Sequence, residues 1–139
     1  MNRRFISHFI FTIILIIFLG FTAFPAVAQQ NGPTETKGLK ITETTVIELN
    51  EEINGMEGRQ LRMRFLVLEP GGTVALHTHS DRPEIIYVQE GIITEYREGA
   101  IIERNKGETW TTGKGTTHGV QNNGEGPATL IVVDIFKEQ

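Results

Sequence analysis

Apolar and polar residues alternate along several stretches of this chain. In residues 39–49 the apolar side chains fall mostly at odd positions, and in residues 59–68 Leu61, Met63, Phe65 and Val67 alternate with polar neighbours. A two-residue period predicts β-strands, because successive side chains of a strand point to opposite faces. Shorter runs rich in Ile, Val, Thr, Tyr and Trp predict further strands over residues 84–89, 92–97, 100–105, 108–112 and 128–136.

Turn signals that contain Gly or Pro separate these runs at short intervals. Pro70-Gly71-Gly72 predicts a turn, since Pro presets φ and Gly accepts a positive φ. The other signals are Glu90-Gly91, Glu98-Gly99, Lys106-Gly107, Asn122-Asn123-Gly124 and Gly126-Pro127. Many short strands at this spacing are typical of an all-β sandwich or barrel, so we predict one all-β domain over residues 39–139.

The N-terminal segment has a different pattern. Arg3 and Arg4 precede an apolar run over residues 9–24, which is followed by Pro25 and the small-residue site Ala26-Val27-Ala28. This order is typical of a signal helix that is removed after export. We therefore predict a signal peptide over residues 1–28, a flexible leader over residues 29–38, and a periplasmic or secreted protein. An uncleaved membrane anchor is the alternative, since the run is just long enough to span a bilayer.

Charge and cysteine content narrow the possible chemistry. The chain has 13 Lys and Arg against 17 Asp and Glu, and loss of Arg3 and Arg4 with the signal peptide would make it more acidic. An acidic domain without a basic stripe is a poor partner for nucleic acid and for anionic membrane surfaces. The chain has no cysteine, which excludes disulfides and thiolate metal sites and leaves nitrogen and oxygen ligands.

Three histidines and one carboxylate stand beside strand or turn signals. His77 and His79 follow a predicted strand over residues 73–76 and, being two residues apart, can point to one face. Glu84 begins the next strand, and an antiparallel return would bring it opposite the two histidines. His118 lies in a later strand, which a barrel can bring into the same interior. Together these four residues predict a transition-metal site.

The spacing of these residues resembles the two sequence motifs of the cupin superfamily. Residues 71–91 fit the first motif, G-x5-H-x-H-x4-E-x6-G, at every fixed position. Residues 107–122 fit the second, G-x5-P-x-G-x2-H-x3-N, with one departure: Gly113 stands where the family usually has Pro. That departure puts the rigidity of the loop in doubt, and it leaves the ligand positions intact.

The resemblance implies a single jelly-roll β-barrel of two facing sheets. It also implies that His77, His79, Glu84 and His118 bind one divalent transition metal inside the barrel, and Mn, Fe, Ni, Cu and Zn all suit these ligands. An octahedral ion would keep two positions open for water, oxygen or substrate, whereas a structural zinc would be closed and tetrahedral. The family often dimerises through N-terminal strands, so we expect a homodimer through residues 39–49.

Strand parity assigns the side chains around the predicted site. Ile86 and Val88 share parity with Glu84 and are expected inside, whereas Ile85, Tyr87 and Gln89 are expected outside. On the last strand two sets of side chains alternate. We expect the more apolar set to face inward, which is Ile131, Val133 and Ile135 rather than Leu130, Val132 and Asp134.

Three bulky or charged residues have two interpretations each. Trp110 is expected in the core or in a subunit interface, with the mouth of a pocket as the alternative. Arg62 and Arg64 are expected at an exposed edge or in salt bridges. Their alternative role is a bidentate contact to a carboxylate substrate.

The sequence leaves three functions open. The first is a metal-dependent enzyme acting on a small molecule, for which the resemblance suggests a dioxygenase ahead of an isomerase or a decarboxylase. Glu84 is then a possible base if it leaves the metal. The second is a non-catalytic module that binds metal or a small ligand, since one fold hosts both roles. The third, a metal-free structural barrel, is disfavoured because it buries three imidazoles and a carboxylate without an ion.

Overall fold

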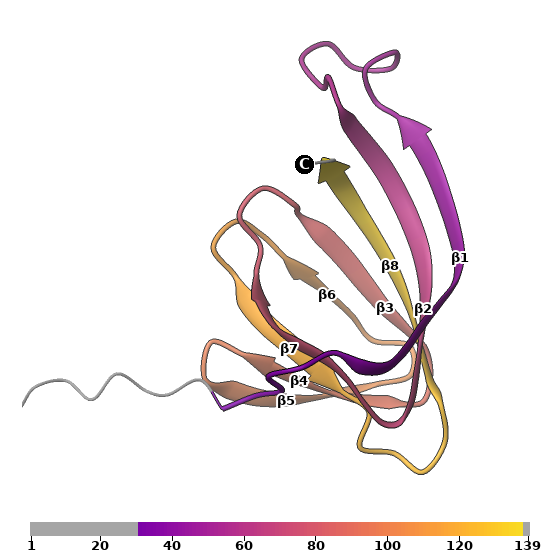
Figure 1. Ribbon diagram of the computed structural model, residues 1–139, viewed down its shortest axis with the longest axis vertical. Helices are drawn as coiled ribbons and strands as arrows, with labels where there is room; N and C mark the ends of the chain where they lie inside the picture. The colour runs from indigo at the N-terminus through magenta and orange to yellow at the C-terminus, as the bar shows by residue number, and fades with distance from the viewer. Residues whose placement is uncertain (1–30, 138–139) are drawn as a thin grey trace, which may run out of the picture.

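A computed structural model describes residues 31–137, which form eight strands (Figure 1). The strands are β1 (Lys37–Glu48), β2 (Arg59–Thr78), β3 (Glu84–Glu90), β4 (Ile92–Arg97), β5 (Ala100–Asn105), β6 (Thr109–Thr112), β7 (Thr117–Gln121) and β8 (Ala128–Lys137). Residues 31–137 include no helix that could cross a membrane. The expected signal peptide lies outside the described residues.

The strands form one antiparallel sheet that curls on itself. Its order is β5-β4-β7-β2-β8-β3-β6, and β1 pairs with β2 beside this path. Figure 1 shows the curl: β4, β5 and β7 lie on one side of an interior, and β3, β6 and β8 lie on the other. The expected all-β barrel fold is confirmed.

β2 joins the two sides of the curled sheet. Its first half pairs with β8, and its second half pairs with β7. The Pro70–Gly72 segment lies between the halves and within the residues of β2, so it joins two halves of one strand and not two separate strands. Gly71 has a φ of 73°, a conformation that glycine adopts without strain, and it lets the strand bend as it changes partners.

The core lies between the two sides. As parity predicts, Ile86 and Val88 are buried with Glu84 on the inner face of β3. Trp110 is also buried, which confirms the expectation that it packs in the core. The buried apolar cluster is Leu66, Leu68, Ile86, Val88, Ile93, Trp110, Val120, Ala128, Leu130 and Val132.

The expected inner face of β8 is wrong. Leu130, Val132 and Asp134 are buried, whereas Ile131, Val133 and Ile135 are only partly buried on the other face. Hydropathy favoured the second set because the first contains a carboxylate. Arginine side chains from β2 bind that carboxylate, and a paired charge can be buried where a lone charge cannot.

Residues 31–36, which belong to the expected leader, bond to the second half of β2. The Leu76 N–H donates to the Pro33 carbonyl at 2.8 Å, and the Ala75 N–H donates to Thr36 Oγ1 at 3.0 Å. The Thr73 hydroxyl donates to the Glu35 carbonyl at 2.7 Å. These bonds hold the chain before β1 against the strand that carries His77.

Candidate metal centre

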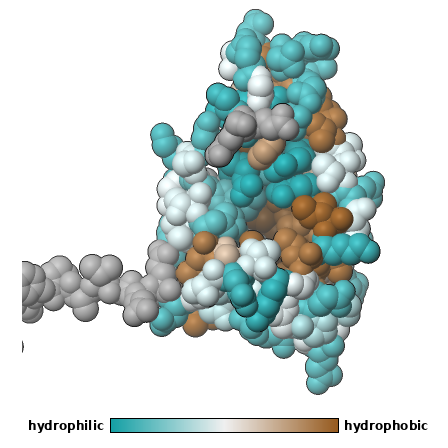
Figure 2. Space-filling view, viewed as in Figure 1, coloured by the Kyte–Doolittle hydropathy of each residue, from teal (hydrophilic) through white to brown (hydrophobic). Residues whose placement is uncertain are grey.

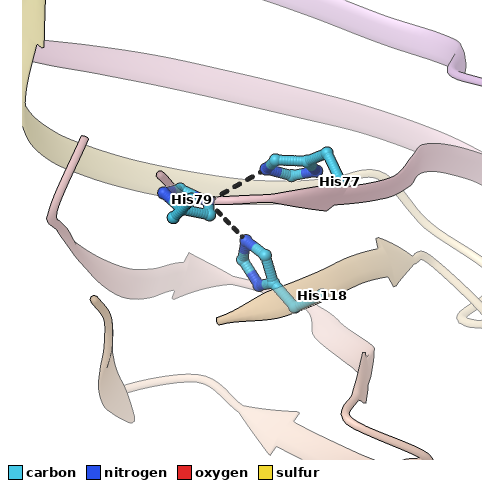
Figure 3. Close-up of side chains that lie close together, drawn as sticks. All are labelled: His77, His79 and His118. Carbon is cyan, nitrogen blue, oxygen red and sulfur yellow. Dashed lines mark hydrogen bonds between the residues drawn. The ribbon is translucent and has the colours of Figure 1, made fainter. Parts of the chain in front are cut away.

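The three histidines of the two motifs meet in the interior of the curled sheet. His77 on β2 is the direct cross-strand partner of His118 on β7, and His79 follows the end of β2. Nε2 of His79 lies 3.0 Å from Nε2 of His77 and 3.0 Å from Nε2 of His118 (Figure 3). His79 and His118 are buried, and His77 is partly buried.

Each imidazole uses its other nitrogen to bond an acceptor. Nδ1 of His77 lies 2.9 Å from the Ala75 carbonyl, and Nδ1 of His79 lies 2.6 Å from the Arg82 carbonyl. Nδ1 of His118 lies 3.3 Å from Glu95 Oε1. Where Nδ1 carries the proton and donates a hydrogen bond to this oxygen, the Nε2 lone pair of the ring is free to bind a cation. All three lone pairs face the same point.

The donor spacing fits a transition metal. Two ligands at right angles, each about 2.1 Å from an ion, lie about 3.0 Å apart, whereas tetrahedral ligands lie about 3.4 Å apart. The two Nε2 separations of 3.0 Å that involve His79 match the right-angled arrangement. Imidazole nitrogen suits Mn, Fe, Ni, Cu and Zn, so the three histidines could bind any of them.

Glu84 reaches this point from across the interior. Its Oε1 lies 3.4 Å from Nε2 of His79 and 3.4 Å from Nε2 of His118. β3 pairs with β6 and β8, so the expected antiparallel return beside the strand of His77 is wrong. The structure nevertheless brings Glu84 close to two of the three histidines, and its role as the fourth ligand stays a prediction.

Burial and neighbouring charges shift the pKa values in the cluster. Burial raises the pKa of Glu84, but the hydrogen bond from His118 and the charges of His79, His118 and Arg82 outweigh it, so the net pKa is lowered. Burial lowers the pKa of His118, but the nearby Glu84 and Glu95 raise it by more, so the net pKa is raised. Burial lowers the pKa of His77. Glu84 is therefore ionised at neutral pH, as a metal ligand must be.

Glu95 on β4 is a functional candidate that the sequence did not single out. Its side chain is fully buried and lies against Nδ1 of His118. Nε and Nη2 of Arg104 both donate to Glu95 Oε2, at 3.0 and 2.7 Å. Arg104 thus holds the carboxylate that orients the His118 ring. The signal available in the sequence was that Glu95 shares strand parity with the apolar Ile93.

The turn at residues 113–116 holds His79 in place. The Gly115 N–H donates to the His79 carbonyl at 2.7 Å, and the His79 N–H donates to the Thr116 carbonyl at 2.9 Å. Gly113, which replaces the usual Pro, donates its N–H to Thr116 Oγ1 at 3.3 Å. Proline has no N–H and could not make this bond, so the turn gains a hydrogen bond where it lacks the ring.

A second charged cluster surrounds Asp134 on β8. Nε and Nη2 of Arg62 donate to Oδ1 and Oδ2 of Asp134 at 3.0 and 2.8 Å, and Nη2 of Arg64 donates to Oδ2 at 2.9 Å. Nε of Arg82 lies 3.8 Å from the same Oδ2. The expectation of salt bridges for Arg62 and Arg64 is confirmed, and neither residue lies at an exposed edge. Glu84 is the register partner of Asp134, which places this cluster beside the histidines.

A cavity of about 390 Å³ opens beside the histidines. Its wall includes His77, Glu84 and His118, and Trp110 from β6 lies in the same wall. Figure 2 shows that this side of the molecule is hollowed, with brown apolar surface beside teal hydrophilic surface. The volume lies within the range of small-molecule sites. A small molecule in this cavity would lie against the three histidines.

Comparison with known proteins matches the motif-bearing part of the chain. A family model described as "Cupin domain" matches residues 64–134. Germin-like protein 1-1 of Oryza sativa subsp. japonica is 39% identical over 116 residues, which cover 78% of this chain and 50% of that protein. The rhicadhesin receptor of Pisum sativum is 32% identical over 108 residues, which cover 74% and 48%. This chain spans about half the length of the curated relatives it matches.

Solved structures also share the fold. The cupin domain of Schizosaccharomyces pombe Cnp3 superposes with a TM-score of 0.56 at 10% identity, over 73% of this chain and 67% of that chain. At this level of identity the likeness concerns the fold alone.

Proposed function

This chain belongs to the cupin domain family, and on that premise we propose that it is a metal-dependent enzyme that acts on a small molecule, with a dioxygenase as the first candidate. The observation that carries the proposal is the convergence of three imidazole Nε2 atoms beside a cavity large enough for a small molecule. In the described part of the chain the donors at this point are three imidazole nitrogens and the nearby carboxylate oxygen of Glu84, which suit a divalent transition metal.

The residues around the cavity would have different roles in the proposed enzyme. His77, His79 and His118 would hold the metal, with Glu84 as the fourth ligand, and the bound ion would supply a Lewis acid with open positions. Glu95 and the Arg82 carbonyl fix the orientation of the His118 and His79 rings. Glu84 would bind the metal as an ionised carboxylate. Trp110 and its apolar neighbours give the cavity a largely apolar wall.

We further propose export to the periplasm or the medium, on the pattern of residues 1–28.

We also propose that the protein forms a homodimer through β1. β1 pairs only with β2 among the described strands, and its Ile41, Val46 and Ile47 are exposed. Pairing such an edge with a second copy would bury it. Light scattering at micromolar concentration is expected to give the mass of two chains, and the mass of one chain would contradict the dimer.

The enzyme proposal predicts metal content and oxygen consumption together. Protein purified from its exported compartment is expected to carry about one transition-metal ion per chain by elemental analysis, since residues 31–137 contain one such donor cluster. An oxygen electrode and a panel of phenolic compounds then test turnover. We expect oxygen uptake that stops on chelation and returns when the metal is restored. Metal retained without turnover on the panel would favour the binding-module role, and protein without metal would contradict the metal-dependent enzyme.

A further inference from the structure

We propose that the cavity binds a monocarboxylate with an apolar body, and that Arg64 and Arg82 contact its carboxylate. The role of this molecule as substrate rests on the proposed function, whereas its binding does not. Arg64 and Arg82 both lie in the wall of the cavity that also contains His77 and His118. An anion held by the two guanidinium groups would therefore place its apolar body within the same space as the histidines.

The charges beside the cavity do not cancel. Arg62, Arg64 and Arg82 bring three positive charges to Asp134, and Glu84 is the nearest second carboxylate. Two carboxylates leave one positive charge in excess, and a divalent ion at the histidines would add two more. A positive excess in a partly buried site is stabilised by an anionic ligand, because water screens it poorly there.

The two arginines that bond Asp134 are held differently. Arg62 makes two hydrogen bonds to the carboxylate, and its guanidinium also stacks 3.8 Å over the ring of Phe136. Arg64 makes a single bond to Asp134 through Nη2. Arg62 therefore neutralises Asp134, and Arg64 keeps donors for a ligand. Asp134 acts as a positioning residue that holds the Arg64 side chain at the cavity wall.

Two residues of the cavity wall each have a buried donor atom without a hydrogen-bond partner among the described residues. These atoms are Nε of Arg64 and Nε1 of Trp110. A buried donor without an acceptor destabilises the folded state, so such donors are rare in folded proteins. A carboxylate supplies several acceptor sites and can satisfy donors on more than one side. Both residues line the same cavity, but the two orphan atoms have almost no exposed surface, so an acceptor in the cavity would reach them only after the side chains turn toward it.

The rest of the wall selects the body of that ligand. Most of it is apolar, with Leu39, Ile41, Leu66, Val74, Ile86 and Val120 among the lining residues. A sugar or a dicarboxylate would leave polar groups against these side chains, at a cost in desolvation. An aromatic or branched monocarboxylate presents one charged end and one apolar end. The charged end would contact the arginines of the wall, and the apolar end would contact its aliphatic side chains.

The test compares the affinity of the protein for benzoate with its affinity for benzamide, which has nearly the same shape without the charge. Isothermal titration calorimetry is performed on the full mature protein, both metal-loaded and chelated. We expect benzoate to bind at least about tenfold more tightly than benzamide, since hydrogen bonds to charged groups are worth roughly tenfold or more in affinity. Arg64→Gln is expected to remove most of this preference. Arg59→Gln, the same change on the same strand but outside the cavity wall, is the matched control and should bind benzoate normally.

Two results would overturn the inference: equal affinity for benzoate and benzamide in the wild type, or unchanged benzoate binding in Arg64→Gln. If Arg64→Gln does not fold, Arg82→Gln replaces it, because Arg82 is less buried. Benzoate binding that persists in chelated protein and depends on Arg64 supports the inference even if the enzyme proposal fails. The protein could instead consume oxygen with neutral phenols and bind benzoate and benzamide equally. That result would support the enzyme proposal and reject the carboxylate site.

Discussion

His118→Ala is expected to lower the bound metal to less than about a tenth of an ion per chain, because changes to groups that merely support a ligand already cost about 10–100-fold in affinity. The substitution removes one of three converging nitrogens, and it also removes the partner of two carboxylates. Elemental analysis of the purified variant, after dialysis against metal-free buffer, measures the loss.

The matched controls separate loss of a ligand from loss of the fold. His118 is buried, so circular dichroism and thermal unfolding of the variant must accompany the metal analysis. His77→Ala is the second variant, since His77 is partly buried and lies at the cavity wall. Asp81→Asn removes an exposed acid near the cluster and should keep its metal. Full metal content in both histidine variants would mean that the ion lies elsewhere.

Glu95→Gln is a milder change that the same metal analysis can test. The amide keeps the shape of the side chain but weakens the acceptor for His118 Nδ1 and removes the counter-charge of Arg104. We expect metal affinity to fall about 10–100-fold, which is less than for His118→Ala. Glu103→Gln, at an exposed position on β5, should change nothing. An affinity for Glu95→Gln equal to that of the wild type would show that the buried carboxylate does not orient the ring.

The sequence predicted those features that depend on local order. Alternation located β1, the first half of β2 and the inner face of β3, because a two-residue period reports directly which side chains share a face. The motif spacing predicted a meeting of His77, His79 and His118, and the β2–β7 pairing produces it. Spacing sufficed here because both histidine segments carry strand signals and the resemblance supplied the barrel.

Features that depend on distant partners were not predictable from one sequence. Pro70-Gly71-Gly72 has the composition of a turn, and only the pairing of β2 with two different strands makes it a bend. The inner face of β8 depends on Arg62 and Arg64, which lie about 70 residues earlier. Hydropathy assigns Asp134 to solvent because it contains no information on those partners. Glu95 was missed for the same reason, since its partners lie on β5 and β7.

These missed residues share a chemical role. Asp134 and Glu95 are buried carboxylates, each held by arginine and each adjacent to a group that faces the cavity. Glu95 fixes a histidine ring, and Asp134 fixes the guanidinium of Arg64. The site is thus supported by two acid–arginine pairs in its surroundings. Rigid support of this kind holds ligand and substrate groups within the narrow tolerances that metal binding and catalysis require.

Asp134→Asn is expected to reduce the free energy of unfolding by about 3–5 kcal/mol, since removing one member of a buried charge pair leaves the other uncompensated. The Asp134 side chain has no exposed surface, and the side chains of Arg62 and Arg64 are only 15% and 13% exposed. Asparagine keeps the size of the side chain, so packing changes little and the loss reports the charge. Urea unfolding at neutral pH, on metal-free protein, measures it. Asp81→Asn, which breaks the exposed pair with Arg59, is the control and should cost less than about 1 kcal/mol.

The double variant Arg64→Met with Asp134→Asn tests the origin of that loss. Removing Arg64 lowers the uncompensated positive charge that Asp134→Asn leaves behind. The double variant is therefore expected to be destabilised by less than the sum of its two single variants, because residues within one ion-pair network do not contribute additively. Additive losses would mean that the two side chains act independently, despite the 2.9 Å contact between Arg64 Nη2 and Asp134 Oδ2. In that case Asp134 would not act as the positioning residue for Arg64.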